Sequence, residues 1–157
     1  MVDEVPPDVI ELSSSQRDVL LDLVLTWATI DGALSMLLAD VRSMGWADAA
    51  DEIRKLRGSH KLAQVIKALK NHESGAEAAR KLRKIKRRYE RFSTLRDHVA
   101  HSRCIGCSKE DPSYIVFLTF ERVGEDMLAM YRVPVEEMSE AISWGTDFVR
   151  LLHRLTR

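Results

Sequence analysis

Residues 20–41 read LLDLVLTWATIDGALSMLLADV, with apolar residues at alternating steps of three and four positions. An α-helix turns once every 3.6 residues, so this spacing brings those side chains to one helical face. The pattern runs through Leu20, Leu23, Trp27, Ile30, Leu34, Leu37 and Val41. Ser13 and Gln16 precede it with capping-box spacing, and Gly45 follows as a stop signal. We therefore expect one helix of about 28 residues, whose internal Gly32 marks a close approach by another helix.

Other segments complete a mainly α fold. We expect a short helix at about 47–57 that Gly58 ends, a helix that Ser59 caps, a helix over about 76–101, and a last helix that Pro134 opens. Alternating apolar residues at 114–120 and a turn at 124–126 predict a β-hairpin over 114–133. The predicted architecture is an antiparallel bundle of four to five helices, with this hairpin before the C-terminal helix.

The composition indicates an ordinary globular protein. The 157 residues are 45% hydrophobic and 31% charged, which suits a single domain over 1–157 with a loosely ordered lead-in at 1–12. The acidic N-terminus lacks the apolar core of a signal peptide, and the apolar run at 19–30 is short for a bilayer. Two cysteines do not make a disulfide framework. We therefore expect a cytoplasmic protein that does not enter a membrane.

The formal net charge of zero conceals a strongly basic segment. Residues 78–103 contain ten Lys and Arg residues against Glu90 and Asp97, a net charge of +8, so the rest of the chain carries −8. Such a segment suits an RNA backbone, although a solvated helix face is the plain alternative. The candidate RNA-binding residues are Arg80, Lys84, Lys86, Arg87, Arg88 and Arg91.

Arg96 breaks the apolar face of the helix expected at 76–101. A guanidinium group is not buried without a partner, so this face must meet a carboxylate, a cleft or another subunit. Asp97 and His101 lie four residues apart, where the carboxylate can hold the imidazole N–H and orient the ring. Arg96 and His101 are about 140° apart around the helix, so two copies of the motif across a dimer axis suit one shared site.

The segment Leu95-Arg96-Asp97-His98-Val99-Ala100-His101-Ser102, at the end of a long helix, resembles the Arg-x4-6-His signature of the HEPN superfamily, in particular its small prokaryotic members. The segment from Trp27 to Leu38, with Asp31-Gly32-Ala33-Leu34, is similar to the first helix of such proteins. The resemblance implies a helical homodimer, and in many members a metal-independent ribonuclease. It would make Arg96 the group that stabilises phosphate charge and His101 the general acid or base. Asp97 fills a position that is more often Asn.

The resulting expectation is an endoribonuclease that cleaves single-stranded RNA at an Arg96/Asp97/His101 site between two subunits and needs no metal or cofactor. The alternative is a non-catalytic HEPN-like dimer that binds RNA, a nucleotide or a regulatory protein. In the plain structural interpretation, His101 interacts only with the helix end and Arg96 pairs with a core carboxylate. His98, His101, Cys104 and Cys107 recur every third residue, but on a helix they fan around half the cylinder, which disfavours a zinc site.

Overall fold

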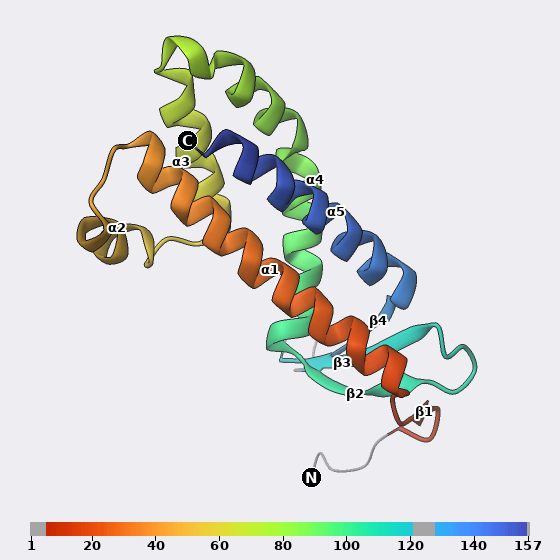
Figure 1. The fold of residues 1–157 in the computed structure, drawn as a ribbon. Coiled ribbons are helices and arrows are strands. Elements are labelled where there is room, and N and C mark those ends of the chain that lie inside the picture. The colour runs from red at the N-terminus through yellow and green to blue at the C-terminus, as the bar shows by residue number, and fades with distance from the viewer. Residues whose placement is uncertain (1–5, 121–127, 157) are drawn as a thin grey trace. The chain divides into compact units, whose positions relative to one another are not determined.

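The computed structural model describes residues 6–120 and 128–156. These residues form five α-helices and a small sheet, which Figure 1 draws as a ribbon. The elements are β1 (Val9–Ile10), α1 (Ser14–Val41), α2 (Trp46–Ile53), α3 (Gly58–Lys70), the 3₁₀ turn η1 (Glu73–Gly75), α4 (Ala76–His101), β2 (Arg103–Ser108), β3 (Tyr114–Thr119), β4 (Ala129–Pro134) and α5 (Val135–Leu155). The mainly α class is therefore confirmed.

The residue contacts divide the chain into two compact units. The first, called the sheet unit, contains the described residues of Met1–Leu25 and Ser93–Ser143. The second, called the helical unit, contains those of Thr26–Phe92 and Trp144–Arg157. Helices α1, α4 and α5 each contribute one part to each unit.

The expected start of α1 is confirmed, and its end is corrected. The Ser13 N–H donates to Gln16 Oε1 at 2.8 Å, and the Gln16 N–H donates to Ser13 Oγ at 3.2 Å, which is the reciprocal capping box. The helix ends at Val41, and the residue that stops it is Ser43 rather than Gly45, because Ser43 adopts a left-handed φ of 53°. The Met44 N–H then donates to the carbonyl of Ala39 at 2.9 Å. Gly45 instead precedes α2 as its N-cap residue.

The predicted cap of α3 is wrong. The helix begins at Gly58 itself, with Arg57 as an N-cap residue whose side chain makes no capping bond. Gly58 is therefore not the stop signal of α2, which ends at Ile53. A side chain at Gly58 would meet the Tyr89 hydroxyl, so a residue without Cβ is needed there. The apolar face of α3 is as expected, since Leu62, Val65, Ile66 and Leu69 are buried.

Aromatic rings form the core of the helical unit. Trp144 and Phe148 of α5 stack with centroids 5.0 Å apart, and Phe92 of α4 lies 5.5 Å from the Trp144 ring. Trp27 of α1 and Tyr89 of α4 stack at 6.4 Å. The periodic apolar positions of three helices thus meet in one cluster, which fixes these helix segments against one another.

The sheet is larger than the expected hairpin. The hairpin is confirmed, because β3 and β4 pair antiparallel from Tyr114–Pro134 to Thr119–Ala129, while the expected turn at 124–126 lies outside the described residues. Two further antiparallel strands extend it in the order β1-β2-β3-β4. Strand β1 lies within the segment expected to be a loose lead-in, and it pairs with the end of β2.

Strand β2 contains a bulge between Cys104 and Gly106. Gly106 has a φ of +141°, a conformation that L side chains rarely adopt, and a Cβ there would meet the Ile10 carbonyl oxygen and the Val9 Cγ1 atom. The bulge breaks the simple alternation of side chains, so the strand lacks the period-2 pattern that indicates a strand. Gly106 thus permits β1 to pair closely with β2.

The expectation that Gly32 allows a close helix approach is wrong, because a Cβ there would meet nothing within 4 Å. The close approach occurs at Gly145 of α5, where a Cβ would lie 2.5 Å from Thr26 Cγ2 of α1. A side chain should therefore have opposite effects on stability at Gly32, where there is space for it, and at Gly106, where there is none. Gly32→Ala should raise the free energy of unfolding by about 1 kcal/mol, because alanine favours a helix.

Gly106→Ala should lower the free energy of unfolding by about 2 to 3 kcal/mol, because the φ and the Val9 and Ile10 contacts both oppose a side chain. Denaturant midpoints of the two variants and the wild type measure both changes. Equal midpoints for the two variants would contradict this account of the two glycines.

Candidate functional site

The Arg96–His101 motif occupies the last turns of α4, within the sheet unit. The helix ends at His101, and strand β2 starts two residues later at Arg103. Leu95 is buried beside the motif, while Arg96 is only partly buried, with 29% of its side chain exposed. The motif therefore places a cation at the edge of the apolar core.

The guanidinium of Arg96 is only partly satisfied. Its Nη1 lies 3.2 Å from Oδ1 of Asp97, the next residue in the chain. Its Nε is buried and has no hydrogen-bond partner among the residues that the structure describes. A buried polar atom without a partner is rare in native proteins, so this group needs an explanation. Protein atoms enclose Nε, so a phosphate group or a second subunit can approach only the exposed 29% of this side chain.

Asp97 does not hold His101. Its carboxylate is 53% exposed and turns toward Arg96, and no hydrogen bond or ion pair between described residues joins it to His101. Pairing of the Asp97 carboxylate with the adjacent Arg96 guanidinium competes with a contact to His101, which lies one helical turn further along α4. The expected Asp97–His101 orienting contact is therefore absent from the single described chain.

The two histidines of the motif have different surroundings. His101 is exposed at the end of α4, with its ring open to solvent. His98 is partly buried, and its ring lies 4.8 Å from the ring of Tyr131 on β4, with the two planes 36° apart. His98 thus packs against the sheet, whereas His101 is accessible to a bound molecule.

The basic residues expected to bind RNA lie on the part of α4 that belongs to the helical unit. Lys86 is partly buried and pairs with Glu90 at 3.5 Å, and the remaining five are exposed. The guanidinium carbons of Arg88 and Arg91 lie 5.6 and 5.1 Å from the centre of the Phe92 ring. At the start of the helix, a hydrogen bond from Lys81 lowers the pKa of Glu77.

Both cysteines lie on β2 rather than on a helix, which corrects the geometry assumed for the His/Cys series. Cys107 is buried, with its Sγ 3.6 Å from the Glu11 carbonyl oxygen, whereas Cys104 is exposed. Protein atoms nonetheless cover part of the Cys104 side chain, and this loss of water raises the pKa of its thiol. Among the described residues, no three His, Cys, Asp or Glu side chains gather as metal ligands would.

Cavities of about 370, 310, 290 and 280 Å³ are all lined by residues of the helical unit. Arg96, Asp97 and His101 line none of these four. In one chain, the motif is thus a surface feature and not the floor of one of these cavities. A site that excludes water from a reacting group would need further walls.

Helix α1 is long and apolar enough to cross a membrane, as judged by length and composition, with a mean hydropathy of 1.5 over 18 residues. Its apolar segment is therefore longer than the run at 19–30 suggested. Core helices of soluble proteins pass the same test, so the cytoplasmic location stays a prediction.

Comparison of the chain with models of known protein families, with curated proteins and with solved structures gave no match.

Proposed function

We propose that this chain is a HEPN-like, metal-independent endoribonuclease that cleaves single-stranded RNA at a site formed by Arg96 and His101 of two subunits. The observation that supports this most is the partly exposed side chain of Arg96 at the edge of the apolar core, close in the sequence to an exposed imidazole. A partly desolvated guanidinium with free donor capacity is suited to a phosphate.

The two side chains divide the chemistry of phosphodiester cleavage. One His101 takes the proton of the ribose 2′-hydroxyl, whose oxygen attacks the adjacent phosphorus. Arg96 stabilises the negative charge that develops on the phosphate oxygens in the transition state. A second His101, or water, gives a proton to the leaving 5′-oxygen, so that a 2′,3′-cyclic phosphate remains.

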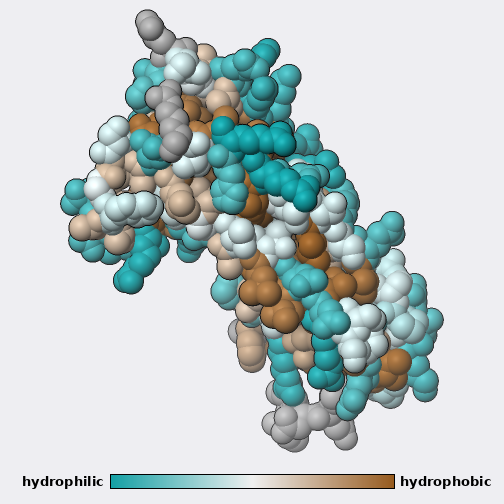
Figure 2. Space-filling model, viewed as in Figure 1, coloured by the Kyte–Doolittle hydropathy of each residue, from teal (hydrophilic) through white to brown (hydrophobic). Residues whose placement is uncertain are grey.

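The proposal includes a two-fold homodimer in which the helices of each chain form an antiparallel bundle. Apolar side chains gather along the visible face of α1 in Figure 2. In the sheet unit, Leu21, Val24 and Leu25 of α1 are large apolar residues with exposed side chains. A second copy that covers this face would bury apolar area and could also bring a second motif to the first.

The six basic residues of α4 named above, of which five are exposed and Lys86 is partly buried, are proposed to follow the RNA backbone. Their charge attracts phosphates without reading bases, so the binding should depend on salt and not on sequence. An RNA-binding role separate from the Arg96/His101 chemistry makes affinity and cleavage independently testable.

The test is incubation of the purified protein with unstructured single-stranded RNA in excess EDTA. We expect cleavage to persist in EDTA and to leave 2′,3′-cyclic phosphate ends, which mass spectrometry of the products identifies. RNA that stays intact, or cleavage that EDTA stops, would contradict the metal-independent ribonuclease.

A non-catalytic dimer that binds RNA, a nucleotide or a regulatory protein is the second candidate, and the Asp97 carboxylate favours it. This group already pairs with Arg96 at 3.2 Å and would repel a phosphate brought to the same guanidinium. Asp97→Asn removes the repulsion. If the wild type binds RNA without cutting it and Asp97→Asn strengthens the binding, the scaffold replaces the enzyme.

A further inference from the structure

A cavity of about 280 Å³ lies within the helical unit, and it is separate from the Arg96/His101 motif. Its walls come from α1, from α2 with the residue that follows it, and from α3. They combine a mainly apolar lining with three charged side chains. The residues that line it are Asp31, Ser35, Met36, Ala39, Trp46, Ala49, Ala50, Ile53, Arg54 and Lys61.

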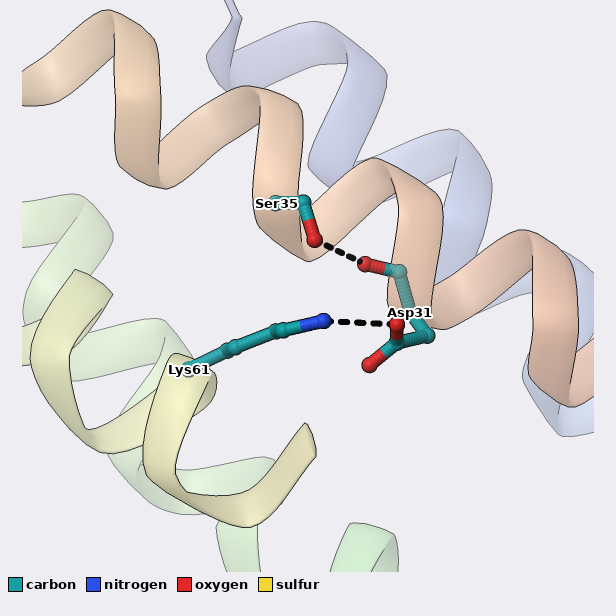
Figure 3. A network of polar contacts seen from close by, with 3 residues as sticks. All are labelled: Asp31, Ser35 and Lys61. Atoms are coloured by element: carbon teal, nitrogen blue, oxygen red, sulfur yellow. Dashed lines mark hydrogen bonds and ion pairs between the residues drawn. The ribbon is translucent and has the colours of Figure 1, made fainter. Parts of the chain in front are cut away.

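An ion pair between the buried Lys61 and the half-exposed Asp31 forms the polar part of this cavity. Lys61 Nζ lies 2.6 Å from Asp31 Oδ2, and the side chain of Lys61 is only 3% exposed while that of Asp31 is 50% exposed. In Figure 3, no dashed line reaches the second carboxylate oxygen of Asp31, which lies 3.6 Å from the position that a Cβ on Gly58 would take. Ser35 is occupied, because its hydroxyl donates to the Asp31 carbonyl oxygen at 2.8 Å. The second carboxylate oxygen thus has no hydrogen-bond partner among the described residues.

Replacing such a pair by apolar residues is often neutral or stabilising, so stability alone is a weak reason for burying Lys61. What the pair does provide is a charged acceptor held rigidly at an apolar cavity. Apolar cavities with a few convergent polar groups are typical small-molecule sites.

The apolar part of the cavity offers a flat surface to an aromatic ring. Trp46, at the start of α2, is 78% exposed, and Met36 of α1 is also exposed. Ala49 and Ile53 are buried beneath them. The exposed indole ring gains contact area when a planar ring packs against it. A flexible methionine side chain can adapt to the edge of that bound ring.

Arg54 follows the last residue of α2 and gives the cavity a net positive charge, since Asp31 and Lys61 cancel. Its exposed side chain makes no hydrogen bond or ion pair within the part of the chain that the structure describes. An exposed guanidinium without such a partner can bind a carboxylate with two parallel hydrogen bonds.

We propose that this cavity binds a small aromatic carboxylate that carries a hydroxyl or N–H donor. The ring lies against Trp46 and Met36, the donor binds the Asp31 carboxylate, and the ligand carboxylate binds Arg54. A cationic ligand would meet the net positive charge, and a plain hydrocarbon would leave both polar partners unused. This binding is independent of the proposed ribonuclease activity, because it involves no residue of the Arg96/His101 motif.

The first test compares three probes by isothermal titration calorimetry. 4-Hydroxybenzoate has both polar groups, 4-methoxybenzoate lacks the donor, and 4-hydroxybenzyl alcohol lacks the carboxylate. We expect 4-hydroxybenzoate to bind about tenfold more tightly than either of the others, because each loses one charge-assisted hydrogen bond. No binding of 4-hydroxybenzoate at millimolar concentration, or equal affinity for all three probes, would overturn the proposal.

Two matched variants on α2 locate the binding. Ala50→Phe fills the cavity, whereas Ala47→Phe places the same side chain at an exposed position of the same helix that does not line it. Ala50→Phe should abolish binding of 4-hydroxybenzoate, and Ala47→Phe should preserve it. Unchanged binding by Ala50→Phe would place the ligand elsewhere and overturn the proposal.

Two further variants assign the polar contacts. Arg54→Gln should remove the preference for 4-hydroxybenzoate over 4-hydroxybenzyl alcohol. Asp31→Leu alone would leave Lys61 buried without its partner, so Asp31→Leu, which removes the acceptor, is combined with Lys61→Met to keep the site neutral. The double variant should lose the preference over 4-methoxybenzoate. Preferences that survive both changes would contradict the assigned contacts, whether or not the protein cuts RNA.

Discussion

His101→Gln is expected to reduce RNA cleavage by about 10²- to 10⁴-fold, the usual contribution of a general acid or base. Glutamine keeps a polar side chain at the helix end but cannot transfer a proton near neutral pH. RNA affinity should stay close to that of the wild type, because we assign it to the basic residues of α4. Single-turnover cleavage and filter binding of the same RNA measure the two properties separately.

His98→Gln is the matched control, since His98 lies three residues before His101 on the same helix and packs against Tyr131. It should retain cleavage, with a loss of stability at most. If His101→Gln cuts RNA as fast as the wild type, or if only His98→Gln loses activity, His101 is not the proton-transfer group.

The second large effect concerns RNA affinity. Replacing Lys84, Lys86, Arg87 and Arg88 together by glutamine should weaken binding roughly 10²- to 10³-fold near 0.1 M salt. Each phosphate contact to a single strand contributes about 0.7 to the slope of log affinity against log salt. The slope should therefore become less steep by about 3 when four contacts are lost. Titrations at several salt concentrations measure both quantities.

A control variant removes the same charge elsewhere, by glutamine at the exposed residues Arg17, Lys55, Lys67 and Lys70. Its affinity and slope should stay near those of the wild type. Equal losses in the two variants would mean that the protein attracts RNA through its overall charge and not through α4.

The helices were predictable from the sequence because their signals are local and redundant. The three-four spacing of apolar residues and the Ser13/Gln16 capping box both indicated α1, which spans the expected 28 residues. Stop signals were less reliable, because a left-handed φ at Ser43 ends α1 where glycine was expected. No sequence pattern indicates which serine will adopt a left-handed φ.

Strands β1 and β2 were missed for a physical reason. Strand β1 has only two residues, and the bulge at Gly106 removes the alternation that would have indicated β2. Their pairing depends on contacts between residues nearly 100 positions apart, such as Val9 with Ser108. Local patterns contain no information about such partners.

The candidate site was predictable in position but not in its contacts. The break in the apolar face at Arg96 was visible in the sequence, and the structure places that side chain at the edge of the core. The contact of Asp97 with Arg96 rather than His101 depends on side-chain conformation, which spacing does not fix. Lys61 gave no signal at all, because a lysine next to the apolar face of a helix usually extends into solvent.

The central claim is that Arg96 and His101 act together across two subunits, and mixing two inactive variants tests it most directly. Arg96→Ala and His101→Ala should each be inactive alone. When the two are unfolded and refolded together, each mixed dimer regains one intact pair, contributed by both chains. Up to about half of wild-type cleavage should return, because about half of the dimers are mixed and the shared site of each then holds one Arg96 and one His101, with water as the second proton donor. Native mass spectrometry that detects mixed dimers without any return of cleavage would contradict the shared site.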